Sequence, residues 1–423
     1  MLVFANNNKF ARYNNKLAPI ARFLFLCLIV LLFIIQPVVQ SFVPTCQVQK
    51  TKLTKFLYTE QSIEEEIAEN IDTQLGDIDF ADLDKTIGDF SSTKEYLGSN
   101  SFIDVVRKFI NAEDASLYSN FINYAISAIF DNLLSYLPYF AIIIVFAIAF
   151  SLISQFANEK NKSMSNLLHI VIFSAIAVIV LKLVLGLLGD TKSVIEGMES
   201  QIEIIFPILL TLITAIGANT TATTFQPLLV IISSGIAKLF TYVLLPLFVF
   251  SIIFGVVGNL SKNVKMDKFS KFFSSLFNWI IGIVFTMFVA FLTIHGLTVS
   301  SIDTISFKTA KFAIKSYVPL LGGYLSDGIN VIIASSVLIK NAVGVSGLIV
   351  MIGTIFMPII KIILVVLLLK LSSAILEPIC DKETPDFLYA ISKSLNMLIV
   401  SIMAVALMYM ITTSLLLSCS NLL

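Results

Sequence analysis

Long apolar segments constrain this chain more than any other feature of its sequence. A helix needs roughly 20 residues, at 1.5 Å each, to cross a hydrocarbon core of about 30 Å. The chain is 57% hydrophobic and 13% charged, whereas a soluble domain carries about 25% charged residues. We therefore expect an all-α, polytopic membrane protein. Six segments are predicted to cross the bilayer, at residues 136–156, 167–188, 239–257, 276–297, 349–371 and 395–417.

The segment 1–41 has the layout of a signal peptide. Basic residues as far as Arg22 precede an apolar run at 23–35, which is too short to span a bilayer comfortably. Positions 39–41 offer a tolerable cleavage site. An uncleaved N-terminal anchor is the alternative, and in either case the segment that follows is exported.

Residues 42–135 form the only sizeable polar part of the chain. Between residues 40 and 136 there are 16 acidic residues and seven lysines and arginines, a formal net charge of −9. We expect an exported acidic helical module here, followed by a membrane domain at 136–423. One helix face in the module is predicted from the spacing of Phe102, Val105, Val106, Phe109 and Ile110.

Two stretches of the membrane domain match each other at a constant offset, without a gap. They cover about 160–260 and 272–372, and parallel internal repeats are common in polytopic membrane proteins. Chance matching between two apolar segments of biased composition is the alternative. Two prolines mark the first repeat, Pro207 and Pro246, and they correspond to Pro319 and Pro358 in the second.

Each repeat contains apolar pieces too short to cross the bilayer, separated by small and polar residues. This pattern is typical of a broken or re-entrant helix, which is tolerated where protein or water covers the free backbone groups. Whether 207–237 and 320–345 re-enter or cross stays open. The predicted breaks lie at Gly217, Asn219 and Thr220 in the first repeat and at Gly322, Gly323 and Gly328 in the second.

The distribution of charge predicts an orientation. If the basic N-terminus is inside, the exported module lies outside, the lysine-rich loop 262–271 lies inside and the acidic loop 190–203 lies outside. The segment 302–318 is predicted to be an interfacial helix. Its lysines would then lie outside, although basic segments usually lie on the inner side of a membrane.

Two charged residues form the candidate membrane-interior polar site, Asp327 and Lys361. Lys361 lies near the middle of a predicted span, where a lysine costs about 2.5–3.5 kcal/mol on insertion scales. Asp327 lies in the glycine-rich start of the second broken element, and a pair would lessen both desolvation costs. Alternatively, an internal cavity solvates Lys361 and Asp327 is interfacial.

Patterns that would indicate catalysis do not occur in the sequence. It contains no H-E-x-x-H, no G-x-S-x-G and no P-loop, and its four cysteines are far apart. No basic patch is interleaved with aromatic residues, as nucleic-acid binding would require. We therefore expect no enzyme, no cofactor, no metal and no nucleic-acid partner.

The order of these features resembles the stage III sporulation protein AE family. The most specific stretches are PILLTL at 207–212 with FQP at 225–227, and FKTAKFA at 307–313 with VPLLGGYLSD at 318–327. The resemblance implies a role in endospore formation in Gram-positive bacteria. It also implies a place in a multiprotein channel or secretion-like assembly, in the mother-cell membrane around the forespore, that supports late forespore gene expression.

Within such an assembly we expect a permease- or pore-like subunit. Two alternatives stay open: a non-conducting scaffold that recruits partners through its exported module, and a stand-alone secondary transporter. The expected partners are the other membrane proteins of the assembly and the lipid bilayer.

Overall fold

The computed structural model describes the chain from residue 71 onward, with gaps. The described residues are 71, 73–76, 80–81, 84, 101–111, 116–158, 162–230, 235–260, 266–317, 322–380 and 382–418. Contacts divide the chain into residues 1–66 and 67–423, and every described residue belongs to the second unit. The predicted signal peptide therefore lies outside the described residues.

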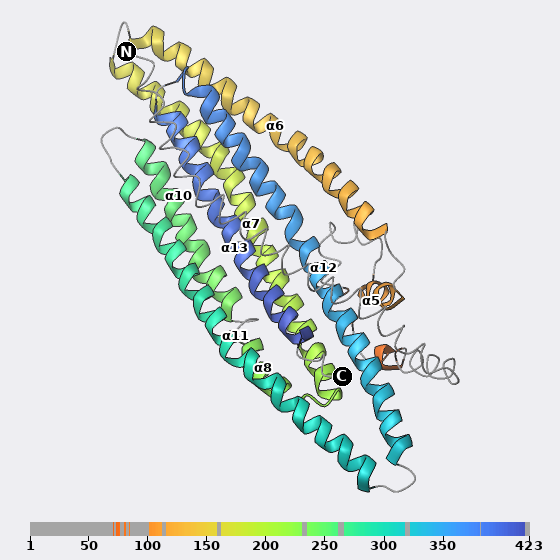
Figure 1. The fold of residues 1–423 in the computed structure, drawn as a ribbon. Helices are drawn as coiled ribbons and strands as arrows, with labels where there is room; N and C mark the ends of the chain where they lie inside the picture. Colours follow the sequence, from red (N-terminus) through yellow and green to blue (C-terminus); the bar gives the residue numbers. More distant parts are fainter. Residues whose placement is uncertain are drawn as a thin grey trace, which may run out of the picture. The chain divides into compact units, whose positions relative to one another are not determined.

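The described part is helical, and six of its helices are long and apolar enough to cross a membrane, as predicted. The helices are α5 (Phe102–Asn111), α6 (Ser116–Asn158), α7 (Lys162–Ala215), α8 (Asn219–Val230), α9 (Ala237–Leu239), α10 (Leu245–Leu260), α11 (Asp267–Tyr317), α12 (Gly322–Leu376) and α13 (Glu383–Ser418). The long helices run alternately up and down. The pairs α6–α7, α10–α11 and α12–α13 are each joined at the same end of the bundle (Figure 1).

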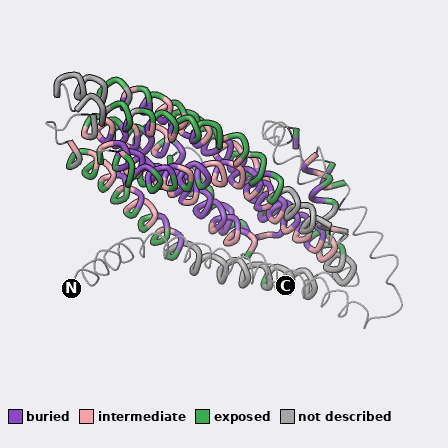
Figure 2. Tube along the Cα trace, turned by 90° about the horizontal axis from the view of Figure 1, so that it is seen from above, coloured by how far each residue is buried: buried purple, intermediate pink, exposed green. Residues whose placement is uncertain are grey.

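Helix α13 lies in the middle of the bundle. It contacts α7, α10, α11 and α12 and is buried over most of its length. Outer helices instead expose large apolar side chains, such as Phe130 of α6 and Trp279 of α11. Figure 2 shows exposed residues along the outside of the bundle and buried residues within it. Contiguous apolar surface of this kind marks contact with lipid or another protein, so the burial pattern fits a bundle inserted in a bilayer.

Three helices are much longer than the predicted spans. Helices α7, α11 and α12 have 54, 51 and 55 residues, which makes them about 77–83 Å long, more than twice the hydrocarbon thickness. The predicted acidic loop 190–203 is part of α7, and residues 302–317 of the predicted interfacial helix 302–318 form the end of α11. The apolar run stops at Asp190 but the helix does not, because lysine and glutamate are good helix formers.

The first predicted break is a turn between α7 and α8. Gly217 has a φ of 93°, a conformation that glycine adopts at little cost. The N–H of Gly217 donates to the Thr214 carbonyl (2.9 Å) and the N–H of Ala218 donates to the Ile213 carbonyl (3.1 Å). These two bonds form a Schellman motif, which satisfies the last carbonyls of α7. Asn219 and Thr220 begin α8.

The second predicted break is not a break within a helix. Gly322 and Gly323 are the first residues of α12, and Gly328 lies inside this continuous helix. Helix α11 ends at Tyr317, and Pro319 lies outside the described residues. The two repeats therefore do not end their helices at corresponding positions, and the repeat stays a prediction from sequence.

The other repeat prolines lie within helices. Pro207 is inside α7 and Pro358 is inside α12, where each removes one backbone hydrogen bond. Pro246 lies in the first turn of α10, directly after the π-helix η2 (Phe240–Leu244). A proline has no N–H for the carbonyl one turn back, and its ring would crowd that carbonyl in a regular α-helix. The wider turn of the π-helix gives the ring room.

The described part of the acidic module packs on α12. Helix α5 contacts α12, and Phe102, Val105 and Val106 are buried, as their spacing predicted. The Asp84 carboxylate accepts hydrogen bonds from the Phe102 N–H (2.6 Å) and the Ser101 hydroxyl (3.1 Å) at the start of α5. The predicted boundary at 135/136 falls inside α6, which also contains the first candidate membrane span, Ile126–Ile153.

Candidate functional site

One face of α12 carries polar or small residues at intervals of seven positions. We call Lys361, Thr354, Gly347 and Lys340 the polar seam. Seven residues make nearly two helical turns, so the four share one face and extend over about 31 Å. At successive levels this face meets α7 and α13, and each of the four makes a specific contact.

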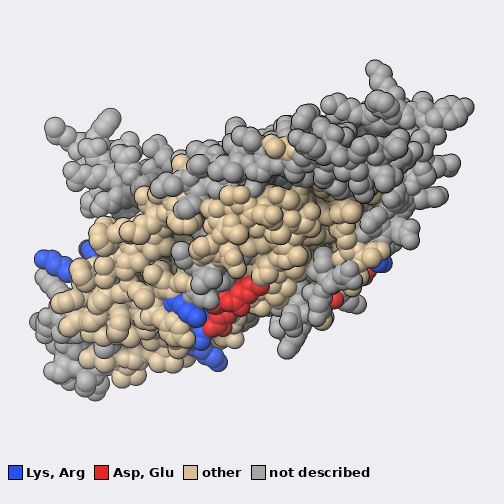
Figure 3. All heavy atoms as spheres, turned by 90° about the horizontal axis from the view of Figure 1, so that it is seen from below, with Lys and Arg blue, Asp and Glu red and all other residues tan. Residues whose placement is uncertain are grey.

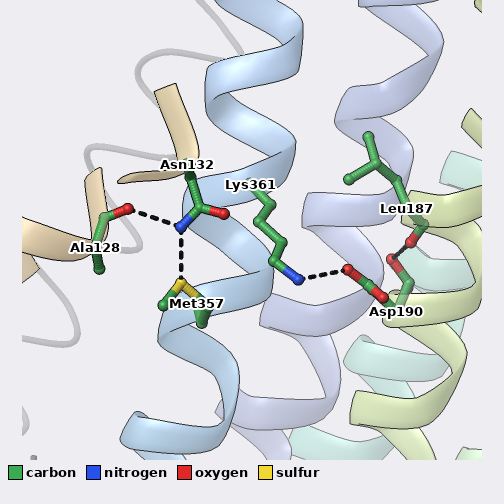
Figure 4. A network of polar contacts seen from close by, with 7 residues as sticks. Ala128, Asn132, Leu187, Asp190, Met357 and Lys361 are labelled. Atoms are coloured by element: carbon green, nitrogen blue, oxygen red, sulfur yellow. Dashed lines mark hydrogen bonds and ion pairs between the residues drawn. The ribbon is translucent and has the colours of Figure 1, made fainter. Parts of the chain in front are cut away.

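At one end of the polar seam, Lys361 forms an ion pair with Asp190 of α7. The ammonium nitrogen lies 3.0 Å from the carboxylate, and the two side chains are 30% and 41% exposed. Figure 4 shows Lys361 reaching across to α7 beside Asn132 of α6, whose amide donates to the Ala128 carbonyl and lies 3.2 Å from the Met357 sulfur. Because the pair is partly exposed, it contributes no more than about 1 kcal/mol.

The predicted pairing of Lys361 with Asp327 is wrong. Both residues belong to α12, and the helix between them places them about 51 Å apart along its axis. Sequence reasoning missed Asp190 as the partner because it assigned that residue to a loop. The sequence did contain a signal, because Asp190 directly follows an apolar run. If the helix continues past that run, an acid there can still face a neighbouring span.

Two turns farther along the polar seam, Thr354 contacts Gln201 of α7. The Gln201 amide nitrogen lies 2.9 Å from the Thr354 hydroxyl, which in turn donates to the Val350 carbonyl (3.0 Å). Both side chains are buried. The Gln201 Oε1 atom has no protein partner, so one polar atom is buried with its hydrogen-bonding capacity unused.

At Gly347 the three central helices meet closely. A Cβ atom at this position would lie 2.8 Å from Ile205 Cδ1 of α7 and 3.0 Å from the Tyr409 hydroxyl of α13. The rings of Phe206 and Tyr409 are 5.6 Å apart. A side chain at this position would require these neighbours to shift, so the three helices pack closely at this level.

Unused polar atoms gather near the same level. Ser346 and Tyr409 are buried, and their hydroxyl oxygens make no hydrogen bond by geometry, although Thr413 lies close to the Tyr409 hydroxyl. Buried hydroxyls usually bond to protein or ordered water. These atoms could therefore hold internal water.

At the other end of the polar seam, Lys340 holds the end of α13. Its side chain is fully buried, and its ammonium donates to the carbonyls of Leu416 (3.3 Å) and Leu417 (2.9 Å). The last carbonyls of a helix have no intrahelical partner and attract positive charge. Sequence reasoning missed Lys340, although a second lysine in the apolar segment that contains Lys361 was a readable signal.

The outward face of α7 is charged over the segment 190–203. Lys192 and Glu196 are 3.6 Å apart and about half exposed. Glu199 lies close enough to Glu203 and to Lys238, which belongs to α9, for their charges to interact. Figure 3 shows acidic and basic side chains side by side on one face of the molecule. This face is unsuited to contact with acyl chains.

The arrangement joins helices rather than performing chemistry. Within the described ranges no three metal-ligating side chains lie together. The polar seam satisfies most of its charged and polar groups by contacts between helices, and such contacts fix the register of one helix against another.

Comparison with known proteins gives two matches. The model of the stage III sporulation protein AE family matches residues 100–420. The stage III sporulation protein AE of Bacillus subtilis (strain 168) is 23% identical over 316 residues, which cover 74% of this chain and 79% of that protein. No solved structure matches the chain.

Proposed function

Because the chain belongs to the stage III sporulation protein AE family, we propose that it is the multi-pass membrane subunit of a sporulation channel or secretion-like assembly. We place the assembly in the mother-cell membrane around the forespore, where it supports late forespore gene expression. The six apolar helices support the membrane location, and the family match, which extends over the whole membrane domain, supports the role in sporulation.

Within this assembly we propose that the subunit acts as a scaffold. The observation that carries this role is the close contact at Gly347, where α7, α12 and α13 leave no room for a Cβ atom. Lys361, which suggested a polar path from the sequence, is neutralised by Asp190. Close packing at this level suits a rigid support better than a path for solutes.

A pore-like role is the second candidate. It is favoured by the unused polar atoms of Gln201 and Ser346, which are fully buried between α7, α12 and α13. If these atoms bind water, a hydrated path could open when α12 moves against its neighbours. The charge of Lys361 would then matter at the entrance to that path.

Substitution of Lys361 separates the two roles. Lys361→Met keeps the length of the side chain and removes its charge, whereas Lys361→Arg keeps the charge. For a scaffold we expect both variants to form spores at near-normal counts, because a partly exposed ion pair contributes little. Lys192→Met is the matched control, since this lysine also pairs with an acid and is more exposed.

Spore counts are read together with the membrane level of each variant. If Lys361→Met abolishes sporulation at normal membrane level while Lys361→Arg retains it, the scaffold role is wrong and the pore-like role is favoured. A loss of protein from the membrane is assessed separately, with Asp190→Asn added to Lys361→Met so that no unpaired charge is left.

Recruitment of partners is tested through the acidic module. Its net charge suits a basic surface outside the membrane. Neutralising the four glutamates of its most acidic segment, which lies outside the described residues, is expected to lower co-purification of other assembly members. Unchanged recovery of the other assembly members would mean that these glutamates form an ordinary solvated surface. The substituted residues are Glu64, Glu65, Glu66 and Glu69.

A further inference from the structure

We infer that the central helices continue beyond the outer surface of the bilayer as a water-exposed helical body, the outer stalk. It consists of α7 after Glu203, α8, α12 from Gly322 to Gly347, and the end of α13 beside them. The α7–α8 hairpin is then an outer structure and not a re-entrant one. Proteins in the aqueous space, not acyl chains, are the partners that this surface fits.

The span formed by α10 and the residues before it is about as long as the hydrocarbon core of a bilayer is thick. The apolar span that contains α10 runs from Ala237 to Gly258, which is 22 residues or about 33 Å, one hydrocarbon thickness. Its exposed large side chains, such as Phe250 and Ile253, are apolar. The outer end of this span is Lys238, which lies close enough to Glu199 of α7 for their charges to interact. Glu203, one turn after Glu199, therefore lies at or beyond the outer limit of the bilayer on α7.

Helix α7 indicates independently that its own end lies outside the bilayer. It exposes Val171, Val178 and Leu185 toward lipid, and then carries the charged segment 190–203. The helix continues without a break to Ala215. A continuous helix cannot turn back, so the part of α7 after Glu203 lies farther out.

The exposed positions beyond Glu203 have the composition of a water-facing surface. From residue 204 to 227, no large apolar side chain is exposed among those that the structure describes. A lipid-facing helix would expose leucine, isoleucine or phenylalanine, as α10 does. The exposed residues here are Pro207, Thr211, Thr214, Ala215, Asn219, Thr223, Gln226 and Pro227.

The acidic module gives a third, independent indication. Gln74 exchanges hydrogen bonds with Ser335 and Ser336 of α12, at 3.3 and 3.1 Å. The module carries exposed charge, including Asp104 and Arg107 of α5, and cannot lie in hydrocarbon. The part of α12 that it touches must therefore be outside the bilayer as well (Figure 1).

The polar seam crosses this limit. Gly347 contacts Ile205, just beyond Glu203, so Lys340 and the end of α13 belong to the outer stalk, whereas Lys361 and Thr354 lie on the bilayer side of Gly347. From Gly347 to Gly322 the stalk extends about 38 Å along α12. The lysine-rich connection between α10 and α11, at the opposite end of the bundle, indicates that the stalk is on the outer side.

The test compares two pairs of exposed positions in the full-length chain. Its cysteines are first replaced by serine, and the chain is placed in vesicles of phosphatidylethanolamine and phosphatidylglycerol. Nitroxide labels are attached at Phe250 and Ile253 of α10, or at Thr211 and Thr214 of α7. We expect collisions with oxygen to dominate at the α10 pair and collisions with a water-soluble nickel chelate at the α7 pair. A lipid-like signal at Thr211 and Thr214 overturns the inference.

A second measurement determines on which side of the membrane the outer stalk lies, and it needs no purified protein. In intact protoplasts, Thr211→Cys and Thr214→Cys are expected to react with a membrane-impermeant maleimide. Lys271→Cys, near the basic connection, is expected to react only after lysis. Reaction at Thr211→Cys and Thr214→Cys with a membrane-permeant maleimide alone, or reaction of Lys271→Cys before lysis, would contradict an outer stalk.

Discussion

Lys340 and Leu417 belong to different helices, and the ammonium of the lysine donates a 2.9 Å hydrogen bond to the carbonyl of the leucine. A second bond reaches the carbonyl of Leu416. The buried ammonium thus provides hydrogen bonds to carbonyls that have no N–H donor from a further turn of α13. This contact, unlike the half-exposed pair of Lys361 and Asp190, is shielded from water, and its loss should be felt more strongly.

Lys340→Met is expected to lower the free energy of unfolding by about 1–3 kcal/mol, because two buried carbonyls lose their donor. The purified protein should unfold several degrees below the unsubstituted chain in a thermal scan. Lys192→Met, on the exposed face of α7, is the control and should unfold at the original temperature. Equal unfolding temperatures for both variants would mean that Lys340 does not hold α13.

Gly347→Ala is expected to destabilise the bundle by about 1–3 kcal/mol, because the new methyl group would lie 2.8 Å from Ile205 Cδ1. Gly328→Ala is the matched control in the same helix. Its Cβ atom would meet nothing within 4 Å, so the better helix propensity of alanine should raise stability slightly. Ile205→Val removes the clashing carbon and should restore part of the loss at Gly347. Absence of such recovery would contradict the contact.

Thr354→Val is expected to cost about 1–3 kcal/mol, because it leaves the Gln201 amide buried without its remaining partner. Gln201→Leu combined with Thr354→Val should be more stable than Thr354→Val alone, since no polar group is then left unpaired. Unfolding in denaturant of the two single variants and the double variant gives the coupling energy. Additive losses would show that the two side chains do not interact.

Neutralising the ion pair should have a small effect that depends on salt. Lys361→Met and Asp190→Asn are each expected to lower stability by less than about 1 kcal/mol, since both side chains are partly exposed. The difference from the unsubstituted chain should shrink as ionic strength rises. A loss of several kcal/mol that does not respond to salt would indicate a pair buried by contacts that the isolated chain lacks, such as a neighbouring subunit.

The number and order of the membrane helices could be predicted from sequence because hydrophobicity alone decides which segments enter lipid. Helix length could not. Asp190 ends an apolar run, but charge does not end a helix, whereas the backbone conformation of Gly217 ends α7. The same error placed the acidic segment 190–203 in a loop and so concealed the partner of Lys361.

The polar seam could be predicted only in part. Lys361 stood out because it is charged within an apolar span. Gly347 and Thr354 did not, because glycine and threonine are ordinary in membrane helices and their meaning comes from the neighbouring helix. Lys340 became informative only with the position of Leu416 and Leu417, which are distant in sequence and belong to the last helix.

The central place of α13 has a consequence for biogenesis. This helix follows the other five membrane helices in the chain, yet it fills the space between α7, α10, α11 and α12. During synthesis those helices enter the membrane before α13, which packs against all of them. Their inward faces therefore lack a partner until α13 is inserted. Insertion of the early spans is therefore separate in time from closure of the bundle, and a ribosome that stalls before α13 would leave a protein that is inserted but open.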